Sequence, residues 1–236
     1  MRRVLVWLHR WVALLLGAWF ALLGLTGAAM VWHDELDAWL NPEWFAARPA
    51  CSDVTRPVAR TIEVFAGAAG GVRPAMISAP RNGGAVYVVS ERAVADGTRR
   101  QHFIDASCGR YLGMRDWGAA RLDRAHVVPA IYELHRSLLG GETGHTLVGI
   151  GGLVLLGITL SGLALAWPRG AQRVGWRRAL TIKRTAAAPR IVYDVHRAVG
   201  LWVLPFLLLM CITGAYLSFP KQGRALVGAL MPTLDG

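Results

Sequence analysis

The sequence lacks the short motifs that mark several common enzyme classes. It contains no Cys-x-x-Cys-His, the attachment motif of a covalent c-type haem, and no Gly-x-Gly-x-x-Gly following a strand. Neither Gly-x-Ser-x-Gly nor His-Glu-x-x-His occurs. The chain therefore does not itself resemble a nicotinamide or flavin enzyme, and its chemistry must be sought in isolated side chains.

Charge is absent from three stretches of 22 residues each, at 11–32, 146–167 and 198–219. A helix rises about 1.5 Å per residue, so each stretch is about 33 Å long and can cross a hydrocarbon core of about 30 Å. Hydrophobic residues make up 54% of the chain, above the usual soluble level. We expect three transmembrane helices, the first of them retained because it exceeds the apolar core of a signal peptide, roughly 7–15 residues.

Positive charges are gathered at two places, the N-terminal segment 1–10 and the segment 168–197, where Asp194 is the single acid. Short loops rich in Lys and Arg stay cytoplasmic. The sequence thus predicts a cytoplasmic N-terminus, an outer segment at 33–145 and an outer tail at 220–236. Because this loop explains much of the net charge of +11, and no recognition motif accompanies it, we expect no nucleic-acid partner.

The outer segment has the pattern of a small α+β module at about 52–117. It predicts one helix followed by an antiparallel meander, since Asn82-Gly83-Gly84 is a hairpin signal. The expected elements are a helix at 58–69, strands at 76–79, 86–90, 100–104 and 110–114, and a returning amphipathic helix at 122–139. The fold class is therefore a mainly α membrane protein with a small α+β outer module.

Cysteine is scarce, with three in the chain. Cys211 lies in an apolar stretch and is expected to be a packing residue. Cys51 and Cys108 bracket the folded part of the outer segment, where disulfides persist. We expect a Cys51–Cys108 bridge; the alternative is two thiols too far apart to join.

One phrase occurs twice. His9-Arg10 is followed by Thr26-Gly27, and His196-Arg197 by Thr213-Gly214, with the same spacing of 17 residues (26 − 9 and 213 − 196). Two helices that run the same way would place both imidazoles at one depth, as a bis-histidine haem requires. We expect His9 and His196 to be axial ligands of one haem, with Arg10 and Arg197 near its propionates; the alternative is interfacial His-Arg pairs.

A second haem would need ligands at the outer face. His33 ends the first apolar stretch, and its partner is either His135 or His145. Those two are ten residues apart, about 15 Å along one helix, so they do not ligate one iron together. The sequence leaves the choice open. His102 and His126 are expected to be ordinary surface residues.

Several phrases together resemble the PepSY-associated transmembrane helix family over about residues 4–219. The phrases are Leu8-His9-Arg10-Trp11, residues 33–37 and 40–42, 105–109, 113–117 and 133–140, Ser161-Gly162, residues 167–169, and residues 194–202. Longer members of this family continue into a second outer segment and a fourth helix. The resemblance therefore implies that a haem with a ligand on that helix would be missing here or would be completed by a second subunit or a homo-oligomer.

The resemblance implies a multi-pass protein of the bacterial inner membrane that holds haem b, one haem or two. Some members are ferric-siderophore reductases. The expected function is transfer of electrons to a ferric siderophore or other ferric chelate in the periplasm, from quinol or a cytoplasmic reductase. The alternatives are a non-catalytic anchored PepSY module that binds or regulates a periplasmic partner, and a haem subunit of a larger redox complex.

Overall fold

The computed structural model describes residues 1–46, 57–80, 86–94, 97–119, 121–168 and 172–230. It is mostly helical, with three helices long and apolar enough to cross a membrane and a four-stranded antiparallel sheet between the first and second of them. The predicted fold class is confirmed. Two compact units divide the chain, one made of residues 1–22 and 145–236 and the other of residues 23–144.

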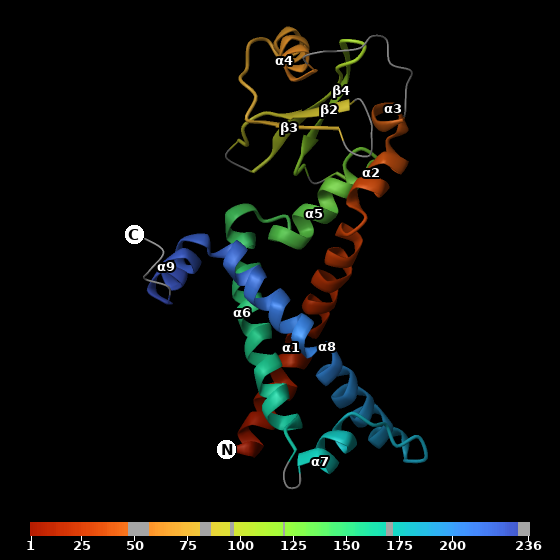
Figure 1. The fold of residues 1–236 in the computed structure, drawn as a ribbon, viewed down its shortest axis with the longest axis vertical. Coiled ribbons are helices and arrows are strands. Elements are labelled where there is room, and N and C mark those ends of the chain that lie inside the picture. The colour runs from red at the N-terminus through yellow and green to blue at the C-terminus, as the bar shows by residue number, and fades with distance from the viewer. Residues whose placement is uncertain (47–56, 81–85, 95–96, 120, 169–171, 231–236) are drawn as a thin grey trace. The chain divides into compact units, whose positions relative to one another are not determined.

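The three long helices are α1 (Arg2–Met30), α6 (Gly141–Ala166) and α8 (Ala188–Ser218) (Figure 1). They contain nearly all of the charge-free stretches, but α1 begins 9 residues and α8 begins 10 residues before them (11 − 2 and 198 − 188). His9 and His196 therefore lie inside their helices, whereas the sequence predicted them at helix starts. The predicted helices were too short because their ends were set by the charge-free stretches. Charged residues can lie in the first turns of a helix, although they interrupt an apolar run.

Small residues of α6 let the helices of the first unit approach closely. A Cβ atom on Gly151 would lie 2.8 Å from the Trp19 ring of α1, and one on Gly149 would lie 2.7 Å from Ser218 Cβ of α8. Neither position has room for a side chain. Close backbone approach at glycine is the usual way in which membrane helices gain packing energy. This unit also holds α7 (Gln172–Ala179) and α9 (Pro220–Leu230).

The second unit is built on the sheet β1 (Met76–Ser78), β2 (Val86–Ser90), β3 (Arg99–Asp105) and β4 (Arg110–Trp117). The strands are neighbours in chain order and antiparallel, as a meander requires. Helix α4 (Pro57–Ala68) covers one face (Figure 1). Its Phe65 packs on Val89 and Ile104, and all three are fully buried.

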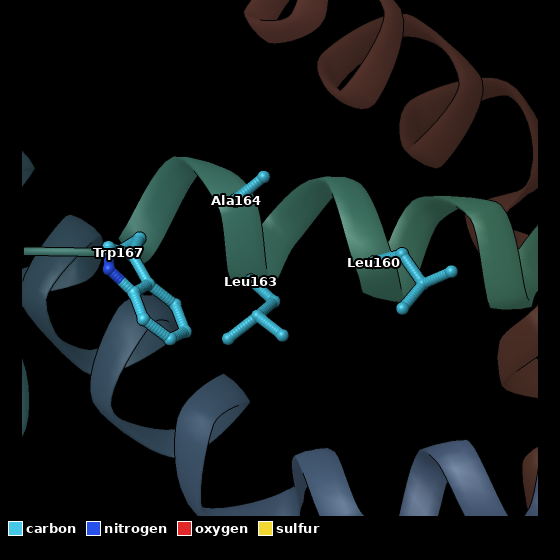
Figure 2. Close-up of a pocket in the computed structure, with 4 residues that line it drawn as sticks. All are labelled: Leu160, Leu163, Ala164 and Trp167. Carbon is cyan, nitrogen blue, oxygen red and sulfur yellow. The ribbon is translucent and has the colours of Figure 1, made fainter.

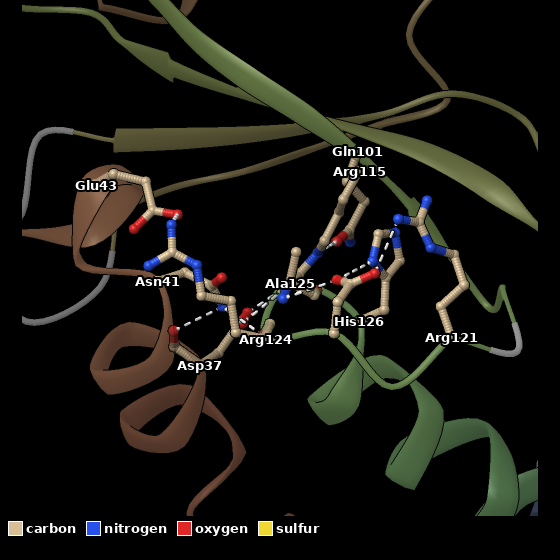
Figure 3. Close-up of polar contacts among 10 residues, drawn as sticks. Asp37, Asn41, Glu43, Gln101, Arg115, Arg121, Arg124, Ala125 and His126 are labelled. Atoms are coloured by element: carbon tan, nitrogen blue, oxygen red, sulfur yellow. Dashed lines mark hydrogen bonds and ion pairs between the residues drawn. The ribbon is translucent and has the colours of Figure 1, made fainter.

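The opposite face of the sheet receives α2 (His33–Leu40) and α3 (Pro42–Phe45). Trp44 stacks on Phe103 with ring centroids 4.1 Å apart. Arg115 of β4 forms a two-pronged ion pair with Asp37, with both N···O distances 2.7 Å, and donates to the Ala125 carbonyl (Figure 3). A buried bidentate pair of this kind fixes both position and orientation, so it ties α2 to the sheet.

The returning chain forms α5 (Val127–Ser137), shorter than the predicted helix at 122–139. Leu138 and Leu139 have φ values of 50° and 59°, in the left-handed region, and these end α5 before α6 begins. The premise that His135 and His145 share one helix is therefore wrong, and helical rise does not fix their separation. The predicted end at residue 139 lies two residues beyond the observed end, whereas the observed start at Val127 lies five residues after the predicted start.

The expected disulfide has one end, Cys51, outside the described residues. Cys108 lies in the β3–β4 turn, where its backbone N–H donates to Asp105 Oδ1 at 3.4 Å. Cys211 is a buried free thiol of α8, as expected for a packing residue.

The Cys51–Cys108 bridge can be tested by peptide mapping of unreduced protein. We expect a linked pair of peptides containing these two residues, separating on reduction, and a Cys211 thiol that alkylates only after denaturation. Free Cys51 and Cys108 in protein secreted into an oxidising compartment would contradict the pairing.

Replacing Asp37 by Asn should destabilise the second unit, because it leaves the Arg115 guanidinium buried without its counter-charge. Breaking a buried pair in this way costs about 3–5 kcal/mol. Asp116→Asn is the matched control, because its pair with Arg100 is exposed and worth about 1 kcal/mol or less. Hydrogen exchange of β3 and β4 amides measures both, and equal effects of the two variants would contradict the account.

Candidate functional site

His9 of α1 and His196 of α8 face each other within the first unit. Their ring centroids are 6.2 Å apart and the ring planes meet at 65°. The two histidines come from opposite ends of the sequence, so the fold brings together the pair that the repeated phrase predicted. His9 is half-buried, and His196 is exposed.

Helix α6 holds the His9 ring in place. His9 Nδ1 lies 2.8 Å from Ser161 Oγ, and a Cβ atom on Gly162 would lie 3.2 Å from His9 Cε1. The hydroxyl gives the ring a polar partner, and the glycine gives it room. In the sequence, Ser161-Gly162 is one of the phrases of the family resemblance, and nothing there indicated its contact with His9.

Two shallow, open apolar grooves lie in the first unit, and one of them includes His196. That groove, of about 520 Å³ on α8, is otherwise lined by aliphatic residues and glycine: Ile191, Val192, Val195, Val199, Gly200 and Val203. The other, of about 460 Å³, is lined by Leu160, Leu163 and Ala164 of α6 and by Trp167, which follows that helix (Figure 2).

The histidine pair fits a haem iron. Two imidazole nitrogens that each bind a metal at about 2 Å place their ring centroids about 6 Å apart, and the observed spacing is 6.2 Å. The flanking α8 groove is apolar, as the body of a porphyrin requires. His9 and His196 are therefore the residues that would hold a haem iron in this unit.

A second histidine is held inside the second unit. His135 of α5 lies with Nδ1 2.9 Å from the Leu23 carbonyl and 3.2 Å from Thr26 Oγ1. A Cβ atom on Gly27 would come within 2.8 Å of His135 Cε1. The Thr26-Gly27 pair, which belongs to the repeated phrase of the sequence, thus contacts the His135 ring.

The contact with the Leu23 carbonyl fixes which nitrogen of the His135 ring carries the proton. A carbonyl oxygen can only accept, so Nδ1 carries the hydrogen and Nε2 keeps its lone pair. That is the form in which histidine binds metals. The repeat does not extend to α8, where Thr213 is exposed and a Cβ atom on Gly214 would meet nothing within 4 Å.

The other two outer candidates are placed differently. His33 has Nδ1 3.0 Å from the Met30 carbonyl and Nε2 3.0 Å from Asp34 Oδ1, so in this arrangement both ring nitrogens face acceptors and neither is available to a metal. His145 lies in the second turn of α6. Of the outer candidates, His135 therefore has the most suitable surroundings for a ligand, and the outer pair stays a prediction.

The two arginines next to the inner histidines have different environments. Arg10 lies over the Trp11 ring, 5.6 Å from its centroid. Arg197 donates to the carbonyls of Arg178 and Ala179 in the last turn of α7 and to Asp194. Asp194, 1% exposed, thus secures the α7–α8 corner beside His196. The sequence signal for Asp194 was that it is the single acid of the basic segment 168–197. Contact with haem propionates stays a prediction for both arginines.

His102 and His126 are not surface residues, which corrects the sequence-based expectation. They are 3% and 5% exposed. His102 Nδ1 lies 2.9 Å from Tyr111 Oη, and His102 Nε2 lies 2.8 Å from Glu91 Oε1. Burial raises the pKa of Tyr111, and the Glu91 carboxylate raises it further. Sequence alone could not reveal this burial, because each histidine stands in a polar stretch whose partners are distant in sequence or in a turn.

His126 immediately precedes α5 and its side chain bonds to the turn before that helix. Its Nδ1 lies 2.6 Å from Asp123 Oδ1, close to the contacts of Arg115 and Ala125 (Figure 3). The hydrogen bond from His126 lowers the pKa of Asp123, and the charges of His126 and Arg121 lower it further.

The lowered Asp123 pKa makes the start of α5 sensitive to acid. The folded form binds this proton less tightly than the unfolded form, so the stabilisation is complete above the ordinary carboxyl pKa of about 3.9 and is lost as pH falls below it. We expect amides at the start of α5 to exchange faster as pH drops from 6 to 3, after correction for intrinsic rates. Asp123→Asn should remove that pH dependence, and an identical acid response in the variant would contradict the assignment.

Comparisons with known proteins give a family. The model of the PepSY-associated TM region matches residues 6–234, nearly the whole chain. One curated relative, "Uncharacterized protein PA4219" of Pseudomonas aeruginosa, is 33% identical over 97 residues. That alignment covers 41% of this chain and 23% of the relative, so the chain matches about a quarter of the relative's length.

Proposed function

The chain belongs to the family of the PepSY-associated TM region, and from that premise we propose that it is a b-type haem electron-transfer protein of the bacterial inner membrane. Its acceptor is a ferric siderophore or other ferric chelate at the periplasmic side. Its electrons come from quinol or a cytoplasmic reductase.

The facing of His9 and His196 carries the proposal. A membrane anchor has no need of two imidazoles from different helices with ring centroids 6.2 Å apart. The family match and the apolar groove beside His196 support the same assignment.

Each residue at the inner site has a task. Haem, when bound, supplies a reversible one-electron carrier. His9 and His196 would hold it, and Ser161 orients His9. The aliphatic groove of α8 excludes water from the macrocycle. Arg10 and Arg197 offer positive charge to propionates, although Arg197 would then exchange one of its contacts with Asp194 or α7.

The orientation follows from charge. Arg2, Arg3 and Arg10 precede or begin the first apolar stretch, and α7 with the following loop is strongly basic, so both belong on the cytoplasmic side. His135, with Nε2 directed away from the Leu23 carbonyl by its own hydrogen bond, is the strongest candidate for a ligand nearer the periplasm.

An absorption spectrum of the purified chain, oxidised and then reduced with dithionite, tests the proposal. We expect a sharp reduced α-band of low-spin haem b and at least one haem per chain in the pyridine haemochrome assay. His196→Ala and His9→Ala should each abolish or strongly weaken the inner haem, because one axial ligand is lost.

His102→Gln is the control, since it removes an imidazole from the sheet and keeps groups that can bond to Tyr111 and Glu91. Its haem content should match the wild type. A colourless wild-type protein, expressed with ample haem, would overturn the proposal. The remaining function would then be an anchored module that binds or regulates a periplasmic partner.

A further inference from the structure

We propose that Ser161 is a positioning residue that fixes the tautomer of His9, so that His9 presents a bare Nε2 to the metal. The inference deepens the function proposed above and rests on it for the identity of the metal. It concerns a residue that touches the ligand and not the iron, and it rests on two contacts of His9 within the first unit and on the same arrangement at His135 within the second.

The first contact is the path of the Ser161 hydroxyl proton. Ser161 Oγ lies 2.7 Å from the Ile158 carbonyl, one turn earlier in α6, and 2.8 Å from His9 Nδ1. A hydroxyl has one hydrogen and a carbonyl has none, so the hydrogen goes to Ile158. The bond to His9 then requires Nδ1–H as donor and Ser161 Oγ as acceptor, which leaves the lone pair on Nε2.

The second contact gives the ring room. Gly162 faces His9 Cε1, and a Cβ atom there would lie 3.2 Å from it. Cε1 lies between the two ring nitrogens, so the glycine lets the ring approach α6 at the point where Nδ1 meets Ser161. Hydroxyl and glycine, adjacent on α6, therefore act together as a socket.

The third observation is the independent recurrence of the same arrangement. His135 meets Thr26 and Gly27 of α1 in the same way, with Nδ1 toward the hydroxyl and a carbonyl and Cε1 against the glycine. There the carbonyl of Leu23 fixes the proton on Nδ1 directly. Two separate histidines are thus held by a hydroxyl–glycine pair in the tautomer that leaves Nε2 free.

A hydrogen bond from Nδ1–H makes the opposite nitrogen a stronger donor. A stronger axial donor favours the ferric state and lowers the reduction potential. Loss of such an outer partner typically reduces metal affinity about 10–100-fold. Ser161→Ala should therefore weaken binding of haem at the inner site within that range and raise its midpoint potential, while Ser161→Thr, which keeps a hydroxyl, should restore both.

Thr159→Ala is the matched control. Thr159 is buried on the same helix, and its hydroxyl donates to the Leu155 carbonyl at 2.8 Å without contacting a histidine. Thr159→Ala removes a hydroxyl that donates to a carbonyl of α6, as Ser161→Ala does. Any general effect on α6 should therefore appear in both variants. We expect affinity and potential to change only with Ser161→Ala.

A measurement without haem separates this inference from the proposed function. Nitrogen NMR of the full chain, haem-free in detergent at about pH 8 and labelled in histidine, reports which ring nitrogen carries the proton; His9→Asn identifies the signals. We expect Nδ1–H in the wild type and a mixture of tautomers in Ser161→Ala.

An Nε2–H tautomer in the wild type, or an unchanged tautomer and potential in Ser161→Ala, would overturn the inference. A wild type that binds no haem sinks the proposed function, and the tautomer measurement then decides the role of Ser161 by itself.

Discussion

An imidazole inside a helical bundle must have a hydrogen-bond partner for its N–H and room for its ring, and the rest of this structure depends on how the helices meet that requirement. Unpaired polar groups away from water cost several kcal/mol. His9 meets Ser161 and Gly162, and His135 meets Thr26 and Gly27. The close approaches that glycine permits are therefore also the places where the candidate ligands His9 and His135 pack against a neighbouring helix.

The architecture could be predicted because it follows from two simple periodicities. Three charge-free stretches of membrane length give the long helices, and alternating apolar residues around a hairpin signal give the meander. The His9–His196 encounter was also predicted, since two helices carry the same His-Arg phrase. Each of these features depends on residues near one another in sequence or on a repeat, which are the properties that a single sequence displays.

What sequence could not supply was the partner of each polar side chain. Thr26-Gly27 and Thr213-Gly214 are identical as text, yet the first holds His135 and the second is exposed with open space beside its glycine. His102 and His126 were taken for surface residues because burial depends on distant strands and turns. Helix α5 begins five residues later than the predicted helix, because residues 123–126 form a bend and turns that their apolar pattern did not reveal.

The central claim is that His9 and His196 bind one metal together, and pulsed electron paramagnetic resonance of the oxidised protein tests it most directly. With histidine labelled in ¹⁵N, the account predicts a low-spin ferric signal coupled to two histidine nitrogens, reduced in His196→Ala. A ferric signal coupled to one histidine nitrogen at most, or unchanged in His196→Ala, would contradict it.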